Sequence, residues 1–197
     1  MGDYVKSVKE GLEESRKFFG NKNKPARELW VLREFLSYLP IKFDESKLSE
    51  SDLEPNDAFY LGYGFQIKEV LSPDRKRGKE YKDKLGSITE NTKPEDFLEQ
   101  YSPIHIPLNE SLPYVASELG RHREEKYSND TGNIDVLVYL NLSDTTYTDE
   151  PVKCSSAEFT LWKSVSLVSN NCAIVLACHE QSNELLSAQV GVLHVKN

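Results

Sequence analysis

Three side chains of complementary chemistry occur close together in the stretch 54–71. Asp57 stands before a short apolar segment, and Gln66 and Lys68 lie two residues apart in a second apolar segment, 65–71. Residues i and i+2 of a β-strand project from the same face, so a strand over 65–71 would place Gln66 and Lys68 side by side. A carboxylate, a carbonyl oxygen donor and an ammonium group that meet at one point would form a candidate active site.

Two glycines, Gly62 and Gly64, separate the apolar segments 58–61 and 65–71. Glycine allows the positive φ angles that tight hairpin turns need. We therefore expect a β-hairpin that brings Asp57 close to the polar pair. Asp57 also ends an acidic stretch of the chain, for which a solvated loop is the ordinary explanation, and the residues alone leave both interpretations open.

The spacing of these residues is similar to a known pattern. In the PD-(D/E)XK nuclease superfamily an Asp is followed, after a spacer, by an acid or Gln, any residue and Lys. Here Asp57 is followed by Gln66, Ile67 and Lys68. Two features depart from the pattern, because Pro55 lies two residues before the Asp and Gln66 stands where an acid is usual.

A closer resemblance is carried by segments spread along the whole chain. They are Arg-Glu-Leu-Trp-Val at 27–31, the block 57–71, Pro-Asp-Arg-Lys-Arg at 73–77, Asp-Val-Leu-Val-Tyr-Leu-Asn-Leu at 135–142, and 162–168. In this order they resemble the bacterial putative-endonuclease family called domain of unknown function 1780. The resemblance implies an α/β fold with a restriction-endonuclease-like core of helix, three-strand meander, helix and strand, preceded by an added N-terminal helix.

The resemblance also implies an activity, a metal-dependent endonuclease that hydrolyses phosphodiester bonds in nucleic acid, DNA rather than RNA. The side chains of Asp57, Gln66 and Glu28 and the carbonyl of Ile67 would hold Mg²⁺ or Mn²⁺, since hard cations take oxygen ligands. Lys68 would orient the attacking water or neutralise developing charge. A homodimer would suit the cleavage of two strands.

A second reading gives the chain no catalytic activity. In this reading it is a nuclease-fold module that binds nucleic acid or a protein partner. Gln66 favours it, because an amide in place of a carboxylate removes a charge from the metal site. The net charge of −8 also favours it, since an acidic chain can contact nucleic acid only through a local basic surface.

Glu28 has two interpretations as well. It lies near the start of an expected helix whose apolar residues, Leu29, Leu32, Leu36 and Leu39, form one stripe. The residues alone favour a first-turn acid that interacts with the helix dipole. The resemblance favours a metal ligand, for which superfamily members often use a Glu on the helix before the sheet, and Glu34 is the second candidate.

Basic residues follow the candidate site. Between positions 68 and 84 there are seven basic and four acidic residues. We expect a helix from Ser72 to about Leu85, and a solvated helix face explains most of these charges. Their position after the candidate site favours phosphate binding by four of them, Arg75, Lys76, Arg77 and Lys79.

The remaining features indicate an ordinary globular protein, with 197 residues that form a single domain over 1–197. No apolar run approaches the roughly 20 residues of a membrane span, so we expect no membrane contact and a cytoplasmic location. The three cysteines lack metal-ligand spacing, and His122 is expected on the surface. Further expected helices are 3–19, 94–100 and 112–127, and further expected strands are 41–43, 134–142, 162–168 and 172–178, with 134–142 beside 172–178.

Overall fold

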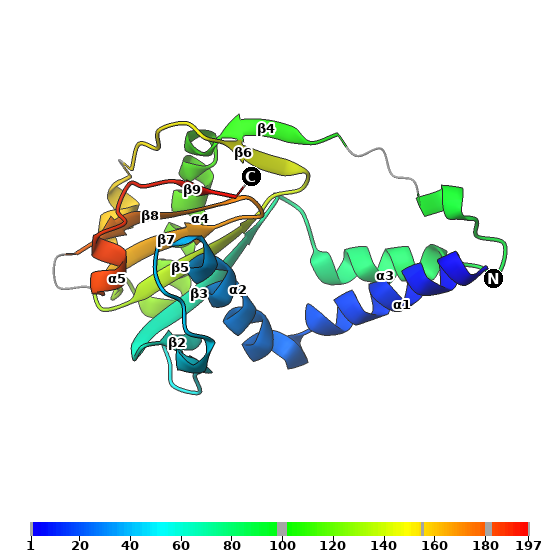
Figure 1. The fold of residues 1–197 in the computed structure, drawn as a ribbon, viewed down its shortest axis with the longest axis horizontal. Coiled ribbons are helices and arrows are strands. Elements are labelled where there is room, and N and C mark those ends of the chain that lie inside the picture. The colour runs from blue at the N-terminus through cyan, green and yellow to red at the C-terminus, as the bar shows by residue number, and fades with distance from the viewer. Residues whose placement is uncertain (1, 98–101, 155, 180–182, 197) are drawn as a thin grey trace.

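A seven-stranded mixed sheet forms the centre of the protein (Figure 1). The computed structural model describes residues 2–97, 102–154, 156–179 and 183–196. The strands β3, β5 and β7 run parallel, and each of the other neighbouring pairs is antiparallel. Their order across the sheet is β1 (Leu48–Glu50), β2 (Ala58–Tyr60), β3 (Tyr63–Leu71), β5 (Asp135–Asn141), β7 (Ser164–Val168), β8 (Cys172–Cys178) and β9 (His194–Val195).

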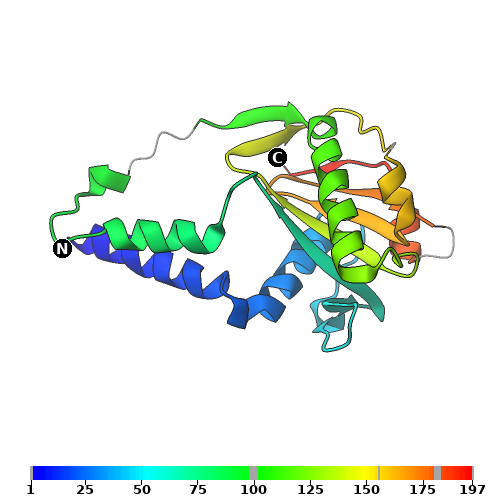
Figure 2. The same ribbon diagram turned by 180° about the vertical axis from the view of Figure 1, so that it is seen from behind.

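Helices cover both faces of this sheet (Figures 1 and 2). α2 (Lys24–Tyr38) lies on one face and α4 (Leu112–Tyr127) on the other. α1 (Asp3–Phe18) and α3 (Arg77–Ser87) lie side by side and project from the sheet as an arm. The prediction of an α/β fold is confirmed, because helices pack on a sheet with a parallel centre.

Smaller elements complete the described chain. β4 (Ile104–Pro107) and β6 (Thr145–Thr148) pair in parallel apart from the main sheet. None of the helices in the described ranges combines the length and apolar character that crossing a membrane requires. The remaining helical segments are α5 (Glu184–Ser187) and the 3₁₀ turns η1 (Asn21–Asn23), η2 (Glu45–Lys47), η3 (Pro94–Phe97), η4 (Leu108–Glu110) and η5 (Ala157–Leu161).

The sheet separates two apolar clusters. Val136 and Val138 of β5 pack into the cluster under α4, and Leu137 between them packs into the cluster under α2. β5 is therefore buried on both faces, as its continuous apolar sequence predicts for a central parallel strand. Its predicted neighbour was wrong, because β7 lies between β5 and β8.

The predicted hairpin is present. β2 pairs with β3 in the register Ala58↔Phe65, and the two residues of the turn, Leu61 and Gly62, have φ angles of 51° and 83°. Positive φ at both positions is the geometry of the two-residue turns that match strand twist. Side chains of β3 alternate as expected, since Phe65 and Ile67 join the cluster under α2 while Val70 joins the cluster under α4.

Two expected elements lie elsewhere in the chain. Residues 41–43 form no strand, and the first strand is β1, whose partner β2 supplies its hydrogen bonds. The helix expected from Ser72 begins instead at Arg77, because Asp74 has a left-handed φ of 64° and the Ser72 hydroxyl accepts a bond from Ser143 N at 2.7 Å. The helix expected at 94–100 is the short η3, and 98–100 fall outside the described residues.

Candidate active site

Asp57 lies at the entrance of the hairpin, in the loop directly before β2. The residue is 8% exposed. The backbone N–H of Asp57 donates to Phe65 O at 2.8 Å, which fixes the loop to β3. One carboxylate oxygen, Oδ2, accepts from Ile67 N at 2.8 Å and from Gln66 Nε2 at 2.7 Å. The hairpin therefore brings Asp57 to the polar residues of β3.

Glu28 reaches the same point from the first turns of α2. Pro25 fits the first turn of this helix because its missing N–H needs no partner there. Glu28 is 6% exposed, and Lys24 Nζ lies 2.9 Å from Glu28 Oε1 and 3.1 Å from Asp57 Oδ1. Glu34, the second candidate, does not reach this point, since its Oε2 pairs instead with Lys196 Nζ at 3.8 Å.

The charges of this cluster alter its protonation. Burial raises the pKa of Glu28, and the nearby Asp57 carboxylate acts in the same direction. Burial acts to lower the pKa of Lys24, but hydrogen bonds to both carboxylates outweigh it and raise that pKa. Lys24 is thus held as an ammonium ion between two nearly buried carboxyl groups.

Gln66 connects this cluster to α4. Its side chain is 2% exposed, and Nε2 lies between Asp57 Oδ2 and the Ile67 carbonyl, 3.2 Å away. Its Oε1 lies 3.1 Å from His122 Nε2. Burial lowers the pKa of His122 to about 4, with the Lys68 charge acting in the same direction. A neutral imidazole can donate its Nε2–H to the Gln66 oxygen.

His122 was expected on the surface, and this prediction was wrong. Its ring is partly buried, with Trp162 stacked at 6.3 Å between ring centroids and Tyr127 edge-on at 5.5 Å. A signal for this position is present in the sequence, because Val115, Leu119 and His122 follow each other at the spacing of one helix face. Lys24 was also missed, although its place four residues before Glu28 predicts an ion pair.

Lys68 shares a strand face with Gln66, as predicted, and lies toward α4. Burial lowers its pKa, and charges on α4 modify the effect, with Glu118 raising the pKa and Arg121 lowering it. Among the described residues no ion pair joins Lys68 to an acid. Lys68 is therefore a half-buried cation beside the cluster and not a member of its hydrogen-bond chain.

The oxygen atoms of the cluster are of the kind that Mg²⁺ prefers, with two carboxylates and the Ile67 carbonyl. Two N–H groups, however, occupy the space between them, the ammonium of Lys24 and the amide nitrogen of Gln66. No set of three or more His, Cys, Asp or Glu in the described ranges is placed to hold a metal ion. The arrangement seen therefore does not fit a bound metal ion unless both nitrogen groups move.

The predicted phosphate-binding residues lie at the other end of β3. Leu71, at that end, lies about 17 Å from Gln66, as calculated from the rise per residue of a β-strand. Arg77 is 7% exposed, lies over the Phe19 ring at 3.9 Å and pairs with Glu69, so its guanidinium is withdrawn from solvent. This burial does not favour the role expected of Arg77, and phosphate binding by Arg77 stays a prediction.

The other three residues of that set remain accessible to different extents. Arg75 is half-buried, and its Nε lies 3.0 Å from Glu80 Oε2. Lys76 and Lys79 are exposed and line an open hollow beside α3. Three acids share this hollow, Asp74, Glu80 and Asp83.

The whole chain belongs to one family. Residues 2–196 match the family described as "Putative endonuclease, protein of unknown function (DUF1780)". Among curated proteins none matches the chain in sequence.

A solved structure shares the fold. It is a protein of unknown function from Pseudomonas aeruginosa strain PAO1, which its name places in the monooxygenase superfamily. The two chains are 23% identical, the match covers 99% of this chain and 95% of that one, and the TM-score is 0.68. At this identity the likeness concerns the fold alone.

Proposed function

We propose that the chain is an endonuclease that hydrolyses phosphodiester bonds in nucleic acid, DNA rather than RNA. The observation that carries this proposal is the convergence of Glu28, Asp57 and Gln66, which come from three separate segments, on one nearly buried point. The description of the family as an endonuclease supports it. We extend the proposal to a restriction-endonuclease-like core, since a meander of β1, β2 and β3 precedes α4 and the parallel strand β5.

Mg²⁺ or Mn²⁺ is the proposed cofactor. Bound near Asp57, such an ion would act as a Lewis acid on the phosphodiester. Four oxygen donors would hold the ion, from Glu28, Asp57, the Ile67 carbonyl and the Gln66 amide. The ammonium of Lys24 would first move away, and the Gln66 amide would rotate so that its oxygen faces the ion. Lys68, half-buried on β3 with Gln66, would stabilise the negative charge that develops during cleavage.

The test is a cleavage assay with labelled single- and double-stranded DNA and RNA, with Mg²⁺, Mn²⁺ or chelator. Asp57→Ala and Lys68→Ala are each expected to reduce metal-dependent cleavage by about 100-fold or more, the size typical for loss of one charge-stabilising group. Lys153→Ala, at an exposed position far along the chain, is the matched control and should cleave like the wild type. Unchanged cleavage by Asp57→Ala would refute the assignment.

A nuclease fold without turnover is the second candidate, and a specific observation favours it. Lys24 and the Gln66 amide together neutralise and fill the cluster in which an ion would bind. Binding of DNA without cleavage under any divalent ion would establish this candidate. DNA binding that is absent or insensitive to salt would indicate a protein partner instead, because phosphate contacts release counterions.

Location and assembly complete the proposal. We place the protein in the cytoplasm, where nucleic acid is accessible to it. A homodimer would present two sites to the two strands of a duplex, and sedimentation of the purified protein would measure its oligomeric state.

A further inference from the structure

The segment that joins α1 to α2 is unusual in its charge. Residues 16–27, here called the basic elbow, contain five basic residues and no acid within a chain of net charge −8. The elbow leads directly into the candidate site, because Lys24 contacts Glu28 and Asp57. The basic residues of the elbow are Arg16, Lys17, Lys22, Lys24 and Arg27.

The basic elbow is held in a defined shape. Asn23 Nδ2 donates to Lys17 O at 2.8 Å, and Arg27 Nη1 donates to Phe19 O at 3.0 Å. The ring of Phe19 stacks on Tyr81 of α3 with 5.9 Å between centroids. Phe18 meets Trp30 edge-on at 6.1 Å. The end of α1 is therefore fixed to α2 and α3 before any ligand binds.

Three cations of the elbow have no acidic partner. Within the described part of the chain, Arg16, Lys17 and Lys22 form no ion pair. In the segment after β3, by contrast, Arg75 pairs with Glu80 and Arg77 with Glu69. Lys76 and Lys79 form no ion pair with the described residues, but they share their hollow with three acids, whose charge opposes a phosphate. An unpaired cation loses no internal interaction when it binds a phosphate, so the elbow is the better phosphate-binding segment.

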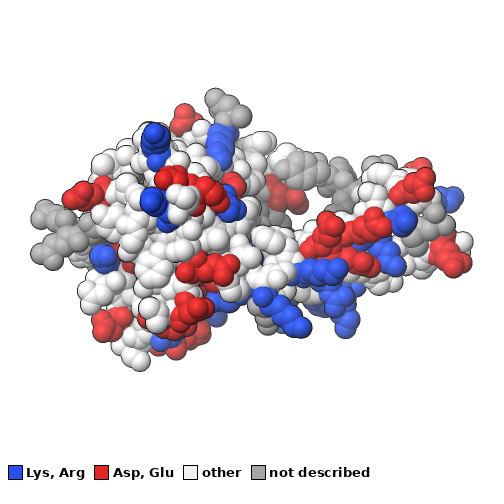
Figure 3. All heavy atoms as spheres, turned by 60° about the horizontal axis from the view of Figure 1, so that its bottom comes forward, with Lys and Arg blue, Asp and Glu red and all other residues white. Residues whose placement is uncertain are grey.

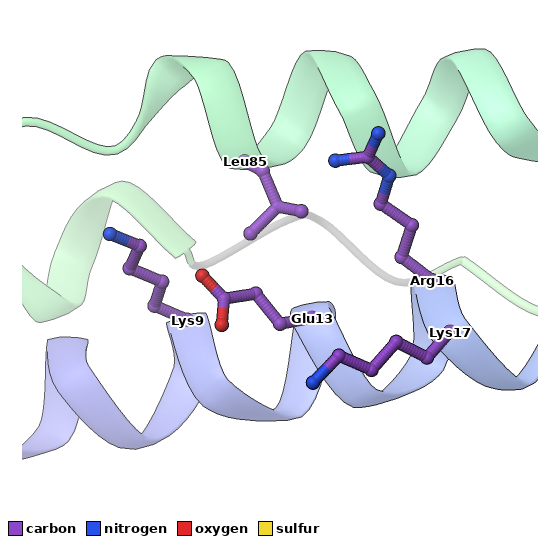
Figure 4. Close-up of a pocket in the computed structure, with 5 residues that line it drawn as sticks. All are labelled: Lys9, Glu13, Arg16, Lys17 and Leu85. Atoms are coloured by element: carbon purple, nitrogen blue, oxygen red, sulfur yellow. The ribbon is translucent and has the colours of Figure 1, made fainter.

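The surface around the elbow is open. Arg16 and Lys17 line a groove between α1 and α3 together with Lys9, Glu13 and Leu85 (Figure 4). In this view Arg16 reaches from α1 toward α3, and Glu13 is the acid of the set. On the face shown in Figure 3, Lys and Arg gather along the lower edge of the arm near the body, with Asp and Glu above them.

We infer that the basic elbow binds the sugar-phosphate backbone of the nucleic acid on which the candidate site acts. This inference rests on the proposed function and names the surface that holds the substrate. A polyanion is attracted to a local concentration of unpaired cations even when the whole chain is acidic. Lys24, at the other end of the elbow, contacts Asp57, so the elbow adjoins the candidate site.

The experiment compares two variants that each lose three positive charges. The elbow variant is Arg16→Gln/Lys17→Gln/Lys22→Gln, and the control is Lys42→Gln/Lys93→Gln/Lys153→Gln at exposed positions outside both basic segments. Binding of a fluorescent DNA duplex is measured by anisotropy in chelator, from about 50 to 200 mM salt. Circular dichroism and thermal unfolding verify that each variant is folded.

The elbow variant is expected to raise the Kd at least about tenfold and to lower the slope of log K against log salt by about 0.9 for each lost contact. The control should change the Kd less than threefold, about 0.6 kcal/mol. An elbow variant that binds like the wild type, or a control that binds more weakly than the elbow variant, would overturn the inference. So would a wild-type protein that binds no nucleic acid.

The binding assay, combined with the cleavage assay described under the proposed function, separates this inference from the proposed function. Asp57→Ala is included because it removes a site residue and leaves all elbow cations in place. Elbow-dependent binding by a wild-type protein that cleaves no nucleic acid supports the binding surface and contradicts the endonuclease. Metal-dependent cleavage by a protein whose binding does not depend on the elbow supports the endonuclease and contradicts the binding surface.

Discussion

Replacement of Lys24 by Met tests how the candidate site is stabilised. The substitution keeps an unbranched, flexible side chain of similar length and removes the ammonium that lies 2.9 Å from Glu28 Oε1 and 3.1 Å from Asp57 Oδ1. The two carboxylates, 6% and 8% exposed, then face each other without a cation between them. We expect the variant to be less stable at neutral pH.

The magnitude follows from the burial of the three groups. Removing one partner of a fully buried ion pair costs about 3–5 kcal/mol, and an exposed pair contributes about 0–1 kcal/mol. The side chain of Lys24 is 51% exposed, so water replaces part of what the ammonium supplied. The free energy of unfolding should fall by about 1–2 kcal/mol, which lowers the Tm by about 2–8 °C for a chain of this size.

Thermal unfolding of wild type, Lys24→Met and Lys24→Arg is the measurement. Lys22→Met is the matched control, because it removes a lysine from the same segment that forms no ion pair with the described residues. Lys24→Arg should keep most of the stability. Mn²⁺ should raise the Tm of Lys24→Met more than that of the wild type, since a ligand that binds only the folded state stabilises it.

The reasoning about Lys24 would be refuted by either of two results. One is a Lys24→Met variant with the same Tm as Lys22→Met, which would mean that the two carboxylates need no internal cation. The other is an equal effect of Mn²⁺ on wild type and Lys24→Met, which would mean that the ammonium and a divalent ion do not compete for the same oxygen atoms.

Two further predictions concern the surroundings of the site. Burial lowers the pKa of His122 to about 4, so the unfolded chain binds this proton before the folded chain does as the pH falls from about 6.5 toward 4. His122 should therefore lower the free energy of unfolding over this pH range. Urea unfolding of His122→Asn should show a smaller loss of stability than the wild type over the same range. Glu28, whose pKa burial raises, acts in the opposite direction, so only a difference between wild type and variant tests His122. Gly64→Ala would place a Cβ 2.3 Å from Asn56 Oδ1 and should destabilise the fold by about 1–3 kcal/mol. Gly11→Ala, at a position in α1 where a Cβ meets no other atom, should stabilise the fold by about 0.5–1 kcal/mol. Equal Tm values for the two variants would contradict this account.

Elements with strong periodicity could be predicted from the sequence. α4 and β8 begin and end at the predicted residues, because an amphipathic stripe and an apolar run define them without help from the rest of the chain. β1 could not be predicted, since it is a short, mostly exposed strand that exists through its pairing with β2. The start of α3 was missed because Asp74 adopts a left-handed conformation that the sequence pattern does not indicate.

Local geometry also explains which site residues could be predicted. The hairpin turn brings Asp57 to Gln66 across nine residues, and Gly62 in this turn indicates it in the sequence. His122 lies 56 residues from Gln66 in sequence, and their contact depends on how α4 packs on the sheet. Packing of this kind is a long-range property, which single-sequence patterns do not contain.

The stacking of Trp162 on His122 has a practical consequence for spectroscopy. A protonated imidazole quenches the fluorescence of an indole ring in contact with it, and a neutral one does so far less. The chain has two tryptophans, and the other, Trp30, sits at the joint of the arm between Phe18 and Tyr139. A Trp30→Phe protein would thus carry a single tryptophan beside the candidate site, and a Trp162→Phe protein a single one at the arm. Tryptophan fluorescence can therefore follow events at the two places separately without an attached dye.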